Sequence, residues 1–203
     1  IANSHRFKVD GYNLCSDTQC QVYKDPSKAN QKIKTAIKKT AGKILTWNNK
    51  PINTVYHATN GGVMASIEEA WSTNPVSYLQ MRLDGPKSWS NKVDLPLSNQ
   101  KYLKSFLLSK SEAFGSDHPL FRWNRTLDAS QISKQLNQAQ KVSSSFYPKK
   151  IKPVSRGASG RVTSLKIEGN TGSEILLKLD DIRRVLRQLP STLFVVKEIK
   201  EGK

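Results

Sequence analysis

Apolar and polar positions along this chain recur with two periods, which predicts both helices and strands. In residues 27–41, Ile33, Ala36 and Ile37 are spaced as on one face of a helix, and Ser27 is a plausible cap. Shorter patterns of the same kind predict helices at residues 64–72, 98–106, 128–139 and 180–189.

Other segments have the period of two that is typical of strands. Residues 161–169 and 173–179 alternate apolar with polar side chains around a turn that contains Gly169 and Gly172, which predicts a hairpin. Residues 43–47 and 52–57 are rich in β-branched and aromatic residues and predict a second hairpin. Single strands are predicted at residues 121–126 and 191–197.

The order of these elements indicates the fold class. Helices and strands follow one another without regular alternation and without an internal repeat, which favours an α+β fold over a doubly wound sheet. The basic stretch 143–157 interrupts the patterns and is predicted to be a loop or connection. With 203 residues the chain is long enough for one core, and we expect a single domain over residues 1–203.

The formal charge of +17 implies attraction to polyanions such as nucleic acid, anionic lipid or an anionic cell wall. Lysines are densest in residues 24–43, where the sole acid is Asp25, although a solvated helix face has the same composition. The sequence contains no apolar run of the roughly 18 residues that span a bilayer, and no signal peptide is visible. Because the chain does not begin with Met, we expect that the natural protein has residues before Ile1.

Cys15 and Cys20 are the two cysteines of the chain. Three interpretations remain open: a disulfide in an exported protein, half of a soft metal site with His5 nearby, or two free thiols. A zinc site requires three or four nitrogen or sulfur ligands.

Several polar and aromatic side chains could carry chemistry. His57 precedes the pair Gly61 and Gly62, which permits a tight turn and close approach of a ligand. A lone histidine beside a strand is more often structural. Glu68 and Glu69 have the pattern of an exposed helix turn that positions Trp71. Trp71, Tyr78, Trp89 and Trp123 could stack on sugar rings, and Arg82, Arg122, Arg125, Arg156 and Arg161 could bind carboxylates.

Two stretches carry a resemblance to a known family. They are the segment from Cys15 to Tyr23, and the run from Tyr56 to Gly62 followed by Trp71, Tyr78 and Leu79. Together they resemble the core signature of the stage II sporulation protein D family (SpoIID/LytB), and further agreement extends through residues 122–125, 159–162 and 182–194.

The resemblance implies a domain of mixed hairpins and short helices that form a groove, with lytic transglycosylase activity on the glycan strands of peptidoglycan. In such enzymes one Glu protonates the glycosidic oxygen, and the muramyl 6-hydroxyl attacks to give a 1,6-anhydro sugar. The resemblance places that Glu upstream of Ile1, which leaves the catalytic residue of this chain unknown and makes His57 a groove candidate. The substrate-binding residues it implies are Tyr56, His57, Thr59, Asn60, Gly61, Gly62, Trp71, Tyr78, Arg125 and Arg161.

The resemblance also bears on cofactors. Some members bind zinc near the position of Cys15 and Cys20, but they carry a histidine where this chain has Gln19, and His5 lies farther upstream than their second histidine. No cofactor is required by the expected reaction, and zinc at Cys15, Cys20 and His5 stays an alternative.

Three functions are therefore compared. The first is a peptidoglycan lytic transglycosylase that acts outside the cytoplasmic membrane, in the cell envelope, alone or with other cell-wall hydrolases. The second is a non-catalytic wall-binding module or amidase enhancer. The third is a polyanion or nucleic-acid binder, which charge alone suggests and which no recognition motif for a specific nucleic acid accompanies.

Overall fold

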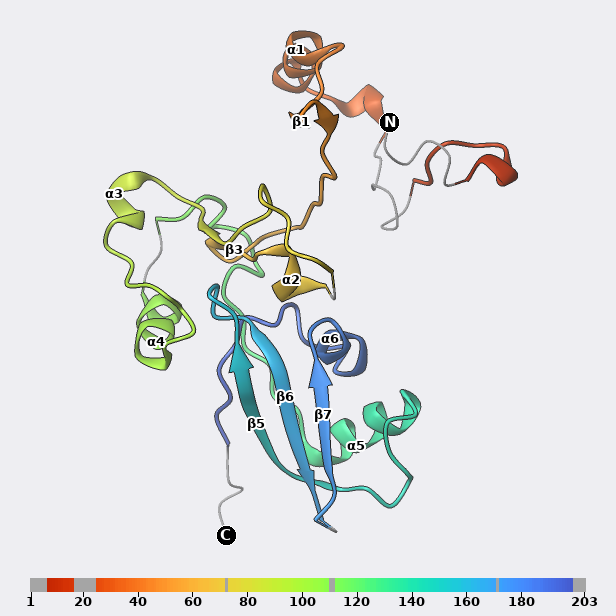
Figure 1. Ribbon diagram of the computed structural model, residues 1–203, viewed down its shortest axis with the longest axis vertical. Helices are drawn as coiled ribbons and strands as arrows, with labels where there is room; N and C mark the ends of the chain where they lie inside the picture. The colour runs from red at the N-terminus through yellow and green to blue at the C-terminus, as the bar shows by residue number, and fades with distance from the viewer. Residues whose placement is uncertain (1–6, 17–24, 72, 110–111, 171, 199–203) are drawn as a thin grey trace. The chain divides into compact units, whose positions relative to one another are not determined.

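The computed structural model describes residues 7–16, 25–71, 73–109, 112–170 and 172–198. The chain divides into two compact units, Ile1–Tyr56 and His57–Lys203. Within the described residues there are six α-helices and three small antiparallel sheets, which confirms the α+β prediction (Figure 1). Among these helices, none has the length and apolarity needed to cross a membrane. A single domain over residues 1–203 remains a proposal.

The first unit consists of short elements. Asn30 has an extended backbone, and its side chain accepts a hydrogen bond from the Ile33 N–H at 3.0 Å, so Asn30 rather than Ser27 caps the helix. The predicted helix over 27–41 is therefore shorter, because Ser27 belongs to a separate 3-10 helix. The elements are the 3-10 helices Lys8–Asp10 and Pro26–Lys28, α1 (Gln31–Thr40), β1 (Thr46–Trp47) and β2 (Lys50–Pro51).

The hairpin of β1 and β2 turns at two asparagines. Asn48 and Asn49 have φ values of 49° and 59°, the left-handed pair that a two-residue turn between twisted strands requires. The hairpin is shorter than predicted, since pairing stops at Pro51. The strand predicted over residues 52–57 is wrong: these residues follow the hairpin as irregular backbone.

The second unit contains a three-stranded sheet in the order β5-β6-β7, formed by β5 (Pro148–Arg156), β6 (Val162–Gly169) and β7 (Glu174–Lys178). Antiparallel pairing of β6 with β7 confirms the predicted hairpin. Residues 148–156, expected as part of a loop over 143–157, are instead an edge strand. Ile151 and Pro153 pair there with Ile167 and Leu165, and an edge strand tolerates proline because its outer N–H groups need no partner strand.

One face of this sheet forms a core with two helices. Leu165 and Ile167 of β6 and Leu177 of β7 are buried against the apolar side chains of α5 and α6 (Figure 1). On the other face, Glu168 and Glu174 bind Lys166 at 2.7 and 2.8 Å, and these hydrogen bonds raise the pKa of Lys166 to about 12. The helices are α5 (Ala129–Gln138) and α6 (Asp181–Val185).

A second apolar cluster of the same unit holds short elements together. Val63, Trp89, Leu103, Phe106 and Phe121 are buried in it. Strands predicted over 121–126 and 191–197 are wrong, since these segments are irregular; Phe121 and Leu193 are buried in this cluster, whereas Val195 and Val196 are exposed. The elements are β3 (Val63–Met64), which pairs with β4 (Arg82–Leu83), α2 (Ile67–Ala70), α3 (Lys87–Ser90) and α4 (Gln100–Leu108).

Candidate functional site

The loop of residues 60–62 is shaped by its own asparagine. Asn60 is buried; its Oδ1 accepts a hydrogen bond from the Gly62 N–H at 2.8 Å, and its Nδ2 donates to Asp84 Oδ2 at 2.6 Å. Gly61 and Gly62 have φ values of 69° and 90°, where a side chain would be strained. The side chains of Asn60 and Asp84 are therefore used to build the turn.

Arg161, the residue before β6, binds the same loop. Its guanidinium donates to the carbonyl oxygens of Asn60 and Val63, both at 3.1 Å, and to Ser159 Oγ at 3.2 Å. Burial lowers the pKa of Arg161, and the nearby Glu69 carboxylate opposes that shift. Arg161 thus binds protein carbonyls in this structure rather than standing open to a ligand carboxylate.

Glu69 completes this network. Its carboxylate accepts hydrogen bonds from the N–H of Ser159, at 3.2 Å, and from the Ser159 hydroxyl. Gly157 lies against it, and a Cβ added there would be 2.2 Å from Glu69 Cδ. The expectation that Glu69 belongs to an exposed helix turn is wrong, because its side chain is only 6% exposed. Ser159 thus links Glu69 to Arg161, because its hydroxyl oxygen also accepts from the Arg161 guanidinium.

Arg122, in an irregular segment, links the loop to the end of α4. It donates to the Gly61 carbonyl oxygen at 2.8 Å and to the Phe106 carbonyl at 3.1 Å, and its guanidinium carbon lies 4.3 Å from the Phe121 ring centroid. Burial lowers the pKa of Arg122. Arg156 is similarly engaged, donating to the Gly160 carbonyl at 2.8 Å. Three of the arginines predicted as carboxylate binders therefore hold backbone instead.

The remaining predicted residues differ in their exposure and in their hydrogen bonds. His57 and Arg125 are exposed, and Arg125 donates to the carbonyl of its neighbour Asn124 at 2.8 Å. Thr59 accepts from the Gly61 N–H at 3.2 Å, which orients its hydroxyl oxygen toward the loop. Tyr78 is half-buried, and Tyr56 is exposed on the first unit.

Of the proposed metal ligands, Cys15 lies within the described residues, where it is disulfide-bonded and so is no thiolate ligand. His5 and Cys20 lie outside them. Within the part of the chain that the structure describes, no group of three or more His, Cys, Asp or Glu side chains could hold a metal ion.

A polar hollow of about 430 Å³ lies beside α2. Glu68 reaches it, and Glu68 Oε2 is buried with no hydrogen-bond partner among the described residues. Trp71 is 42% exposed at its rim. A buried acceptor without a donor is a cost, and a ligand donor that reaches Oε2 when the covering atoms shift would remove it. Among the described residues, the lining consists of Glu68, Trp71, Thr73, Asn74 and Leu179.

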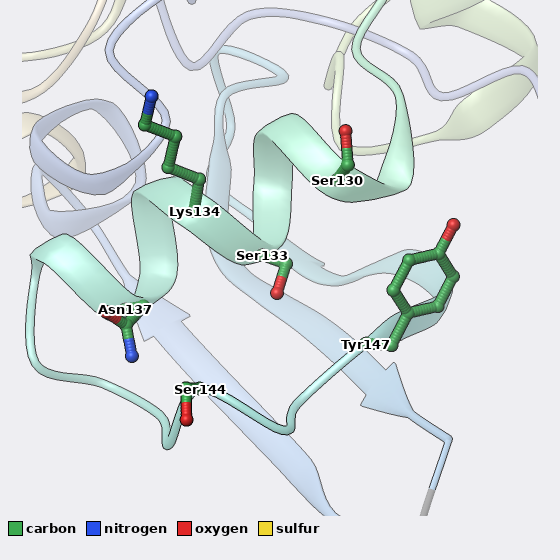
Figure 2. Close-up of a pocket in the computed structure, with 6 residues that line it drawn as sticks. All are labelled: Ser130, Ser133, Lys134, Asn137, Ser144 and Tyr147. Carbon is green, nitrogen blue, oxygen red and sulfur yellow. The ribbon is translucent and has the colours of Figure 1, made fainter.

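A second hollow, of about 310 Å³, lies between α5 and the segment that leads into β5 (Figure 2). Its polar groups are used locally: Ser130 donates to Asp128, Ser133 to the Phe146 carbonyl and Asn137 to the Val142 carbonyl. Lys134 points away from Tyr147 in Figure 2. The bonds from Ser133 and Asn137 attach the segment to α5. This hollow therefore offers a ligand fewer unbonded polar groups than the hollow beside α2.

Comparison with protein families divides the chain. Residues 65–203 match the family described as "Domain of unknown function (DUF8618)". Residues 1–47 match the family described as "Stage II sporulation protein", which confirms the resemblance for the N-terminal segment. The expected continuation of that resemblance through residues 122–125, 159–162 and 182–194 lies in the part matched by the other family.

Two curated relatives bear the name "Stage II sporulation protein D". The protein of Bacillus amyloliquefaciens is 36% identical over 92 residues, which is 39% of this chain and 26% of the relative. The protein of Bacillus subtilis (strain 168) is 35% identical over 80 residues, 34% of this chain and 23% of the relative. The chain thus matches about a quarter of each relative's length, and no solved structure matches it.

Proposed function

We propose that this chain, which belongs to the family described as "Domain of unknown function (DUF8618)", holds peptidoglycan glycan strands for a lytic transglycosylase reaction in the cell envelope, outside the cytoplasmic membrane. The observation that carries the proposal is the match of residues 1–47 to the "Stage II sporulation protein" family. The relatives named stage II sporulation protein D support it over a longer stretch.

The geometry favours a role in holding the strand. Arg122 and Arg161 fix the loop of residues 60–62 from two directions, which gives a rigid base next to the exposed His57. A rigid scaffold lowers the conformational entropy lost when a ligand binds. The formal charge of +17 would favour an anionic wall over neutral surfaces.

The reaction requires one carboxyl group that donates and then accepts a proton. Glu69 and Asp84 are poor candidates, because Glu69 is bonded to Ser159 and Asp84 to Asn60. This observation favours a second candidate function, a wall-binding module or amidase enhancer that binds glycan without cleaving it.

Digestion of purified glycan strands, with and without stem peptides, tests the proposal. The chain is incubated with the strands, and the products are identified by mass. Muramyl ends with the 1,6-anhydro ring would support the transglycosylase. Retained strand binding without such ends would support the wall-binding module.

Binding measured at increasing salt concentration distinguishes the transglycosylase and the wall-binding module from a polyanion binder. Attraction to charge alone falls steeply as salt rises, because counterions screen fields over about 10 Å at 0.1 M and about 3 Å at 1 M. Binding that disappears with salt and is equal for glycan strands and DNA of matched length would contradict a glycan function. Binding to uncharged glycan that persists at high salt would support one.

A further inference from the structure

We infer that the hollow lined by Glu68, Trp71, Thr73, Asn74 and Leu179 is a subsite for one pyranose ring of a glycan strand. The inference rests on the proposed function and deepens it, because it assigns the strand to a particular place on the chain. None of the residues that fix the 60–62 loop is part of this lining.

The local structure brings the two principal side chains together. Glu68 lies in α2, and Trp71 comes directly after the end of this helix; the side chains of both line the hollow. The backbone of Trp71 is extended, with φ −131° and ψ 154°, so the helix ends before this residue. Leu179, the residue after β7, also lines the hollow.

Glu68 supplies the polar recognition. Its Oε2 atom is buried without a hydrogen-bond partner among the described residues, whereas the adjacent Glu69 is bonded to Ser159. A carboxylate oxygen accepts hydrogen bonds only, so the ligand group that satisfies it must be a donor. Sugar hydroxyls and N-acetyl N–H groups are such donors, and a bond to a charged acceptor is stronger than one between neutral groups.

Trp71 supplies an apolar face. Its side chain is 42% exposed, in a protein where Trp89 is buried at 5% exposure in a core. The C–H face of a pyranose is a flat apolar surface that can cover an exposed indole while the ring hydroxyls point sideways. Thr73 and Asn74, both exposed on the rim, add a hydroxyl and an amide that can donate or accept at those hydroxyls.

The form of the hollow fits this ligand class. Its volume of about 430 Å³ lies within the range of about 300–1,000 Å³ that small-ligand sites occupy. A metal ion is a poorer match, because a hard cation takes about six oxygen ligands and Glu68 is the lone carboxylate of the lining.

A peptide-free tetrasaccharide of alternating N-acetylglucosamine and N-acetylmuramic acid is the probe. It is titrated into the full chain while calorimetry measures the dissociation constant. We expect Glu68→Gln and Trp71→Ala each to weaken binding at least about tenfold. Matched controls are Glu112→Gln, an exposed acid outside the lining, and Trp47→Ala, an exposed indole of the first unit; both should bind like the parent. Thermal unfolding of every variant checks that it is folded.

The outcomes separate the subsite from the wider function. Equal affinity of the parent, Glu68→Gln and Trp71→Ala for the tetrasaccharide would overturn the subsite and leave the proposed function standing. If the chain cleaves or binds intact glycan strands but does not bind the tetrasaccharide, the subsite alone would also be overturned. Failure to bind either ligand would overturn both.

Discussion

Glu68 and Glu69 are neighbours in the sequence and have opposite environments. Glu69 is 6% exposed and bonded to Ser159, which in turn accepts from Arg161. Glu68 instead leaves one carboxylate oxygen unsatisfied among the described residues. Consecutive helix positions point about 100° apart, so one side chain enters the interior and the other enters the hollow.

Glu69→Gln is expected to destabilise the protein by about 1–3 kcal/mol, because it replaces the buried carboxylate that accepts from both the N–H and the hydroxyl of Ser159 and that lies near the half-buried Arg161. The measurement is the free energy of unfolding from urea denaturation. Glu68→Gln is the matched control and should be neutral or slightly stabilising. Equal effects of the two substitutions would show that the Glu69 network contributes little.

Gly157→Ala should also destabilise, by about 1–3 kcal/mol, because the added methyl group would overlap the Glu69 carboxyl group. Differential scanning calorimetry would show a lower Tm. Ala158→Ser, at the exposed neighbouring position, should leave the Tm unchanged. A Gly157→Ala protein as stable as the parent would mean that Glu69 can move aside without loss.

At the scale of elements, local sequence signals correctly predicted the start of α5 and the β6–β7 hairpin. Asp128 and Gln131 form a reciprocal capping box at the start of α5. Residues 162–169 alternate apolar and polar side chains and form β6. The sequence did not predict β5, because its lysines and prolines show no clear alternation. Its extended backbone is fixed by antiparallel pairing with β6. Trp123 and Phe194 lie in segments that were predicted as strands, yet their rings are 6.2 Å apart in an irregular part of the core.

The cap of α5 makes a prediction about pH. Hydrogen bonds from the Gln131 N–H and the Ser130 hydroxyl lower the pKa of Asp128 in the folded state. Its contribution to stability is therefore present above the unfolded pKa of about 4 and is lost as pH falls through the lower folded pKa.

Asp128→Ala is the substitution that tests this cap. At pH 7 it should lower the Tm by about 2–4 °C, and the difference from the parent should shrink below about pH 4. Asp94→Ala, at an exposed position, is the control. A Tm difference that is the same at pH 7 and at pH 2 would contradict the assignment of the charge to capping.

At the scale of the whole molecule, the buried apolar residues found in the described part of the chain belong to the second unit. Both cores are built from residues between Val63 and Phe194, and α1 has no buried residue. Exposed Ile33 and Ile37 on α1 leave that ten-residue helix dependent on other contacts, since isolated helices shorter than about 12–15 residues are marginal in water.

Residues 57–203 are therefore expected to fold without residues 1–56. The fragment should unfold in one cooperative transition at a temperature close to that of the parent, with the near-ultraviolet circular dichroism of its packed aromatic residues retained. Residues 1–56 expressed alone should show little helix. A fragment 57–203 that lacks a cooperative transition would mean that the first unit is part of the core.

Local patterns in the sequence were sufficient for the α+β class, for the β6–β7 hairpin and for the position of α5, because these depend on residues a few positions apart. The roles of the charged residues were not accessible in that way. Glu69 and Ser159 are 90 positions apart, and Arg161 meets the Asn60 carbonyl across a similar separation. Burial and hydrogen-bond partners arise from packing between distant segments, so the fold assigned Arg122 and Arg161 to the scaffold and left Glu68 with Trp71 at the open hollow.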